Sequence, residues 1–138
     1  MRAFVSTPGG PVPAEIRDVP EPALGAGEAL VEVRAFGVNR GELTLLANRT
    51  DWRPGQDSAG VVVQPAEDGS GPPAGARVVA LVDQAGWSQR VGARTSRLAQ
   101  LPDSVSFEAG AALPVAGLTA LRALRIGGAL LGRSVLST

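Results

Sequence analysis

The chain has 138 residues, with 13 basic and 13 acidic side chains and a formal net charge of zero. This length suits one compact domain, and zero net charge argues against a nucleic-acid binder, which needs a clustered positive face. The sequence contains no Cys, His, Lys or Tyr. Disulfides, thiol nucleophiles, Ser-His-Asp triads, Schiff-base chemistry and zinc sites built on thiolate or imidazole are therefore excluded. Carboxylates, hydroxyls, amides and backbone groups remain for catalysis, or the chemistry of a bound cofactor.

No segment of the sequence predicts export or membrane insertion. The start of the chain, Met1–Val5, is strand-like and is followed by Pro8 and two glycines, which is unlike the charged and then apolar layout of a signal peptide. The longest apolar stretches are far shorter than the roughly 20 residues of a membrane helix. We therefore expect a cytoplasmic protein with no membrane partner.

Short strands separated by Gly and Pro turns account for most of the chain up to Leu101. Alternation of polar and apolar residues predicts strands over Arg2–Val5, Ala14–Val19, Ala29–Val38, Ser58–Gln64, Arg77–Val82, Gly86–Val91 and Thr95–Ala99. Asn39, with Glu42 three residues later, is typical of a capping box and predicts a helix that ends near Ala47. Many short strands with such turns predict a barrel or sandwich.

The pattern becomes helical after Pro102. Ser106 is a candidate cap for a short helix over residues 106–113, and Pro114 suits the first position of a second helix, which Gly127 and Gly128 end. An apolar strand is then predicted over Arg133–Ser137. No partner strand is coded after it. A stand-alone module is expected to protect this edge by pairing with another copy of the chain, whereas a fragment of a larger architecture is expected to be a monomer with a disordered tail.

Five motifs follow one another along the chain: RAFGVN from Arg34, PGQDSAGVV from Pro54, GARVVA from Gly75, LPVAGLTA from Leu113 and GRSVL from Gly132. In this order they resemble the medium-chain dehydrogenase/reductase superfamily, and within it the zinc-independent quinone oxidoreductase branch. The resemblance implies a mainly β, GroES-like, partly open β-barrel with short helices as the catalytic domain over residues 1–112. It also implies that residues 113–138 form the first helix and strand of a truncated, α/β Rossmann domain.

The resemblance further implies NADPH as the cofactor and no zinc. In the family, a glycine-rich turn after the first Rossmann strand carries the pyrophosphate at a helix N-terminus. This chain has no such turn, so we expect most of the cofactor site to be missing from it. Zinc-dependent relatives place Cys where this chain has Asn39, and His-Glu where it has Gln56 and Asp57. Neither kind of zinc ligand is available here.

Four residues are candidates for the site by this resemblance. Asn39, Gln56 and Asp57 are candidate catalytic residues, and Asn39 and Thr119 are candidate contacts to the nicotinamide. Each also has a plainer interpretation. Asn39 suits a helix N-cap, Gln56 and Asp57 suit a turn after a Pro-Gly pair, and Thr119 suits a helical Thr that bonds back to a carbonyl one turn earlier.

The function implied by the resemblance is an NADPH-dependent reductase that passes hydride to the C=C or C=O of a quinone or enone. The protein would supply orientation, a dry cleft and hydrogen bonds to the developing oxyanion. This chain would be its catalytic-domain portion, inactive alone, with a homodimer or a separate Rossmann-domain polypeptide as partner. Two alternatives stay open: a cofactor-free binding or assembly module, or a chain shortened by deletion that has no activity of its own. The sequence identifies neither the substrate nor the choice of NADPH over NADH.

Overall fold

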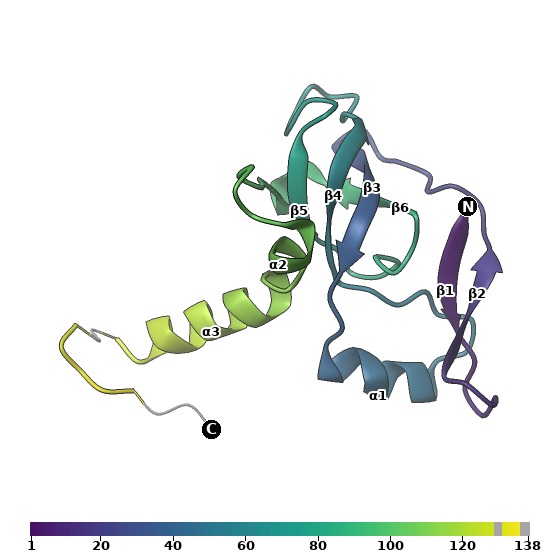
Figure 1. Ribbon diagram of the computed structural model, residues 1–138, viewed down its shortest axis with the longest axis horizontal. Coiled ribbons are helices and arrows are strands. Elements are labelled where there is room, and N and C mark those ends of the chain that lie inside the picture. The colour runs from purple at the N-terminus through teal and green to yellow at the C-terminus, as the bar shows by residue number, and fades with distance from the viewer. Residues whose placement is uncertain (129–130, 136–138) are drawn as a thin grey trace.

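A computed structural model describes residues 1–128 and 131–135 of the chain. A curled, five-stranded antiparallel sheet dominates it, and a two-stranded ribbon lies beside this sheet (Figure 1). The strand order in the large sheet is β6-β3-β4-β5-β7. The predicted mainly β, partly open architecture with short helices is confirmed.

The elements have the following bounds. The ribbon pairs β1 (Arg2–Ser6) with β2 (Ala14–Asp18), and the large sheet contains β3 (Glu28–Phe36), β4 (Asp57–Gln64), β5 (Arg77–Leu81), β6 (Arg90–Arg94) and β7 (Leu98–Gln100). The helices are α1 (Arg40–Asn48), α2 (Phe107–Ala111) and α3 (Pro114–Ile126), with one 3-10 turn, η1 (Thr95–Arg97).

The main core lies inside the curl of the large sheet. Along β3 the burial alternates as strand geometry requires, with Ala29 and Val31 fully buried and Arg34 exposed. Small and β-branched side chains from four strands, and from the residue after β5, make up the cluster: Ala29, Val31, Val62, Val78, Ala80, Val82, Val91 and Ala93. These residues suit a tightly curled sheet because they fill a narrow space and favour extended backbone.

Strand β3 lies inside the sheet and pairs with β4 on one side and β6 on the other. Its register with β4 shifts twice, between Leu30 and Val31 and between Val33 and Ala35. Such irregularities bend a strand and increase its twist. They curl the sheet and direct the end of β3 toward α1.

Two of the predicted strands are displaced in the structure. The residues around Trp87 are not a strand, because the Trp87 backbone bonds to Phe4 and Pro54 outside the large sheet, and β6 begins only at Arg90. The predicted strand over Thr95–Ala99 is wrong in its first half, which forms η1. In both places tertiary contacts override the local alternation.

The predicted strand over Arg133–Ser137 is not present in its described part. Residues 133–135 have no strand structure and are exposed, and residues 136 and 137 lie outside the described residues. Within the part of the chain that the structure describes, no strand lies beside them to complete a ladder. The preceding helix, α3, extends away from the sheet (Figure 1).

Candidate functional site

Three segments that are distant in the sequence meet where β4 begins. Asn39 occupies the N-cap position of α1, and its Nδ2 donates to Asp57 Oδ2 at 2.9 Å. The other carboxylate oxygen, Asp57 Oδ1, accepts the backbone N–H of Val115 in the first turn of α3 at 3.0 Å. Asp57 is 1% exposed, so both of its oxygens are satisfied inside the protein. One buried carboxylate thus connects the loop after β3, the start of β4 and the start of α3.

A second buried carboxylate, Glu42, holds two backbone segments of the same region. Its Oε2 accepts the N–H of Asn39 at 2.7 Å, which is the Glu half of the predicted capping box. Its Oε1 accepts the N–H of Gln56 at 2.8 Å. The Gln56 carbonyl in turn accepts the N–H of Val82 at 2.8 Å. The sequence indicated Glu42 only as a capping residue, and its second role depends on a loop 14 positions away.

The two carboxylates are tolerated in the interior because N–H donors surround them. A buried ionised group is costly unless it is hydrogen-bonded, and Glu42 and Asp57 together accept four N–H bonds. Each carboxylate also lies at the first turn of a helix, Glu42 on α1 itself and Asp57 beside α3. The positive end of the helix dipole favours a negative charge there.

Gly37 allows these segments to approach one another. Its N–H donates to the carbonyl of Asp57 at 3.0 Å, and its own carbonyl accepts the indole N–H of Trp87 at 2.8 Å. A Cβ added at Gly37 would lie 2.7 Å from the carbonyl oxygen of Ala111 at the end of α2. The close packing of β3, β4 and α2 at this point therefore requires glycine.

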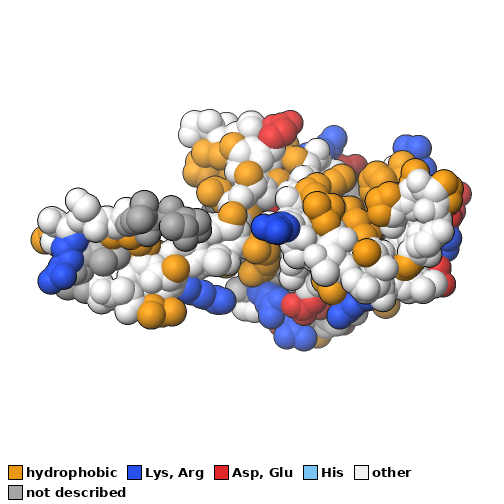
Figure 2. All heavy atoms as spheres, turned by 90° about the horizontal axis from the view of Figure 1, so that it is seen from below, with side chains coloured by type: hydrophobic (Ala, Val, Ile, Leu, Met, Phe, Trp, Pro, Cys, Tyr) orange, Lys and Arg blue, Asp and Glu red, His pale blue; other side chains and the backbone are white. Residues whose placement is uncertain are grey.

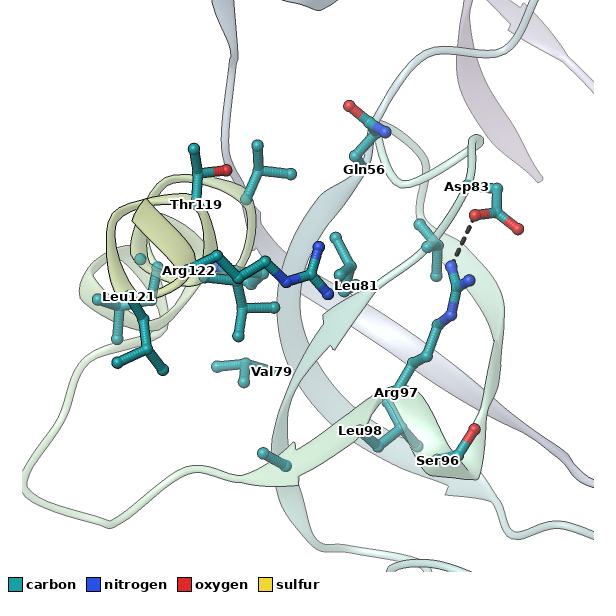
Figure 3. A pocket seen from close by; sticks show the side chains of 17 residues that line it. Gln56, Val79, Leu81, Asp83, Ser96, Arg97, Leu98, Thr119, Leu121 and Arg122 are labelled. Carbon is teal, nitrogen blue, oxygen red and sulfur yellow. Dashed lines mark hydrogen bonds and ion pairs between the residues drawn. The ribbon is translucent and has the colours of Figure 1, made fainter. Parts of the chain in front are cut away.

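An open groove of about 760 Å³ lies beside this cluster, with β5 and β7 on one side and α3 on the other (Figure 3). Val79 and Leu81 form part of its apolar floor, and Gln56 and Thr119 lie along its rim. At the opposite end the Arg97 guanidinium pairs with Asp83 at 2.6 Å. A groove with an apolar floor and a few polar groups at its rim has the character and size of a small-molecule site.

The structure brings the four predicted site residues into one region, although not into one set of contacts. Asn39 and Asp57 are bonded to each other, and Gln56 is adjacent to Asp57 in the sequence. Thr119 lies one helical turn after Val115 on α3 and lines the groove together with Gln56. Asn39 is at the N-cap as its plainer interpretation predicted, whereas the turn interpretation of Asp57 is wrong because this residue begins β4.

Arg53 is a feature of this region that the sequence did not indicate. Its Nε and one terminal nitrogen are buried with no hydrogen-bond partner among the described residues. Burial lowers the pKa of this guanidinium, because desolvation disfavours its charged form. Arg53 precedes the Pro54-Gly55 pair that leads into Gln56, so this unpaired cation lies next to the site in the sequence.

Residues 1–128 and 131–135 contain neither a metal-binding cluster of side chains nor a membrane-spanning helix. No three side chains of the types His, Cys, Asp and Glu gather there as a metal site would require. No helix in the same ranges is both long and apolar enough to cross a membrane.

The chain is similar in sequence and in fold to parts of several known reductases and oxidoreductases. Trans-enoyl reductase tndF of Aspergillus flavipes is 36% identical in an alignment that is 140 positions long, gaps included, and that covers 88% of this chain and 39% of the relative. The quinone oxidoreductase from Coxiella burnetii superposes with a TM-score of 0.84 and 25% identity, covering 91% of this chain and 44% of that one. The quinone oxidoreductase from Thermus thermophilus, solved also in complex with NADPH, superposes with a TM-score of 0.78 and 34% identity, covering 94% and 42%.

The chain therefore spans between 39% and 44% of the length of these three relatives. A model of the alcohol dehydrogenase GroES-like domain matches residues 25–119, which include the whole cluster around Asp57 and end at Thr119. The structural neighbours are quinone oxidoreductases of the medium-chain dehydrogenase/reductase superfamily, as the sequence motifs predicted. The chain belongs to the alcohol dehydrogenase GroES-like domain family.

Proposed function

We propose that this chain is the catalytic-domain portion of an NADPH-dependent reductase that transfers hydride to a quinone or an enone. The observation that carries the proposal is the groove between α3 and the sheet, with the polar side chains of Gln56 and Thr119 at its rim (Figure 3). The names of the relatives support the reductase class, since they include an enoyl reductase and quinone oxidoreductases. We also propose that the catalytic domain ends near residue 112, just before α3 begins.

The residues at the groove fit the nicotinamide end of the cofactor. A carboxamide needs hydrogen-bond donors and acceptors beside an apolar surface for the ring. The Thr119 hydroxyl and the Gln56 amide can supply the hydrogen-bond donors and acceptors. Leu118 and Leu81 line the apolar part of the groove. When bound, NADPH supplies the hydride.

This chain's own residues orient the reactants and stabilise charge. The Gln56 side-chain amide is a donor at the groove, and its backbone is held from both sides by Glu42 and Val82. Asn39 keeps one Nδ2 hydrogen beyond the one that it donates to Asp57, although Asn39 is beside the groove and is not one of the residues that line it. Fixed donors of this kind stabilise a developing oxyanion because they need no reorganisation during the reaction.

One observation favours the alternative function, a cofactor-free binding or assembly module. Leu118, Leu121 and Leu124 on α3 are each about two-fifths exposed, at 39%, 42% and 43%. Figure 2 shows hydrophobic side chains at the surface of the part of the molecule that projects from the sheet and contains α3. An exposed apolar helix face is typical of an interaction surface. A second copy of the chain is the partner we propose for this module.

Titration with NADPH tests the reductase proposal. The chain has two Trp and no Tyr, so tryptophan emission reports binding cleanly, and calorimetry serves as an independent measurement. Although most of the cofactor site is expected to be missing from this chain, saturable binding that Thr119→Val weakens would support the proposal for this polypeptide, provided that Thr44→Val, the same change at an exposed position of α1, leaves the binding unchanged. Consumption of NADPH with benzoquinone or crotonaldehyde then distinguishes a quinone from an enone acceptor.

Two results would contradict the reductase proposal for this polypeptide. One is the absence of NADPH binding up to millimolar concentration. The other is binding that Thr119→Val and Thr44→Val affect equally. Sedimentation of the same samples tests the alternative, which requires a concentration-dependent dimer that a charged substitution at Leu121 dissociates.

A further inference from the structure

We infer that Asp57 is a positioning residue that locks Asn39 to the first turn of α3 and thereby sets where Thr119 lies relative to Asn39. The inference builds on the roles proposed above for Asn39 and Thr119. It moves Asp57 out of the group that contacts substrate, because both of its carboxylate oxygens are already bonded within the protein.

The contacts of Asp57 join segments that are distant along the chain. Its partner Asn39 is 18 residues away along the chain, and its partner Val115 is 58 residues away. The backbone of Asp57 is also fixed, since its carbonyl accepts the Gly37 N–H at 3.0 Å. The carboxylate therefore projects from a rigid point, and the two donors that it binds are held at a defined separation.

Burial along α3 is confined to its start, where the bond to Asp57 lies. Pro114 is the only residue of α3 that is buried, and every residue from Leu118 to Ile126 is exposed. Figure 3 shows Thr119 on the helix wall of the groove and Gln56 on a separate segment of the chain. The first turn of α3 therefore decides where Thr119 lies, and Val115 in that turn donates to Asp57.

The geometry of the position requires two acceptor oxygens on one side chain. Two N–H donors converge on it, one from each side, and only a carboxylate offers two equivalent acceptor oxygens. An amide offers one oxygen, so its NH₂ group would face a donor. The negative charge also lies at the positive end of the α3 dipole.

Three variants test the inference through pairing and rescue. Asp57→Asn leaves one donor facing an NH₂ group, and Asn39→Asp places two carboxylates against each other in a buried position. The double variant, Asn39→Asp with Asp57→Asn, restores a complete set: the new amide donates to the new carboxylate, and its oxygen accepts from Val115. Asp103→Asn is the matched control, because it makes the same chemical change at a fully exposed side chain.

The first readout is hydrogen exchange at the Val115 amide, followed by NMR. A hydrogen bond to a charged group corresponds to about a 10- to 100-fold change in an equilibrium. We therefore expect exchange at Val115 to accelerate by about 10-fold or more in Asp57→Asn and in Asn39→Asp. Val115 exchange in the double variant should return close to the wild-type rate. In Asp103→Asn it should equal the wild-type rate.

The inference is overturned if Asp57→Asn leaves Val115 exchange unchanged. It is equally overturned if Val115 in the double variant exchanges about 10-fold or more faster than in the wild-type protein. Because this second criterion compares the double variant with the wild type, it applies even where a single variant does not fold. A second readout is the side-chain NH₂ signals of Asn39, which should shift in Asp57→Asn and stay in place in Asp103→Asn.

NADPH affinity separates this inference from the proposed function. If the wild-type chain binds NADPH, we expect the single variants to weaken binding and the double variant to recover it, in parallel with Val115 exchange. If the wild-type chain binds no NADPH, the proposed function fails, while Val115 exchange and its rescue still decide the role of Asp57. Loss of NADPH affinity without any change at Val115 would contradict the positioning role alone.

Discussion

Glu42 and Gln56 are joined by a buried hydrogen bond of 2.8 Å from the Gln56 backbone N–H to the Glu42 carboxylate. This bond links the first turn of α1 to the loop that enters β4. Because the side chain of Gln56 lines the groove, a carboxylate outside the groove determines where a groove residue is held.

Replacing Glu42 with Gln should destabilise the protein. Gln has one acceptor oxygen, so one of the two backbone N–H groups would face the NH₂ group and lose its partner. We expect a loss of about 1.5–3 kcal/mol in the free energy of unfolding. Urea unfolding, followed by tryptophan emission, measures it. Glu67→Gln, at an exposed loop position, is the control and should change this value little. Equal stability of the two variants would show that the Glu42 bonds contribute nothing.

Two glycine-to-alanine substitutions should change the stability of the protein in opposite directions. Gly37→Ala places a Cβ 2.7 Å from the carbonyl oxygen of Ala111 and 3.0 Å from Asp57 Cβ, which we expect to cost about 1–3 kcal/mol. Gly41→Ala, inside α1, meets nothing within 4 Å and should stabilise the helix by up to about 1 kcal/mol. Thermal unfolding of both variants gives the comparison, and a stabilised Gly37→Ala would show that the contact at α2 is readily relaxed.

The two tryptophans should respond differently to replacement by Phe. Trp87 donates its indole N–H to the Gly37 carbonyl at 2.8 Å and stacks on Phe36 with ring centroids 5.5 Å apart. Trp52 is equally buried, but its ring lies beside the Arg49 guanidinium, and its indole N–H has no partner within the described residues. We expect Trp87→Phe to cost about 1–3 kcal/mol more than Trp52→Phe, because the Gly37 carbonyl loses its donor. Denaturant unfolding followed by circular dichroism measures both, and equal costs would contradict this account.

The loop between β4 and β5 should show a low carboxyl pKa. Hydrogen bonds from Ser70, through its hydroxyl and then its backbone N–H, lower the pKa of Asp68. A lowered folded-state pKa means that these bonds stabilise the loop above the ordinary carboxyl pKa of about 4 and are lost as the pH falls through the lowered value. An NMR titration of the Asp68 carboxyl should therefore show a midpoint below the ordinary one. Ser70→Ala should raise that midpoint, and an unchanged midpoint would exclude the Ser70 hydroxyl as a cause.

Local sequence pattern predicted most of the elements around the site. The alternation in β3, the Asn39 and Glu42 spacing before α1, the Ser106 cap of α2 and the Pro114 start of α3 are all present in the structure. These signals work because strand periodicity, caps and proline geometry act over a few neighbouring residues. The pattern was wrong around Trp87 and Thr95, where contacts with distant segments decide the backbone.

The absence of Cys, His, Lys and Tyr from the sequence limits the side chains that could take part in catalysis to carboxylates, hydroxyls, amides and guanidinium groups, apart from the chemistry of a bound cofactor. The sequence motifs also indicated the family and pointed to Asn39, Gln56, Asp57 and Thr119. The enclosure of Asp57 between Asn39 and Val115, and the support of Gln56 by Glu42, emerged only from tertiary contacts. The physical reason is that a buried carboxylate takes its role from the donors that surround it. Those donors come from backbone segments up to 58 residues away, which no local pattern specifies.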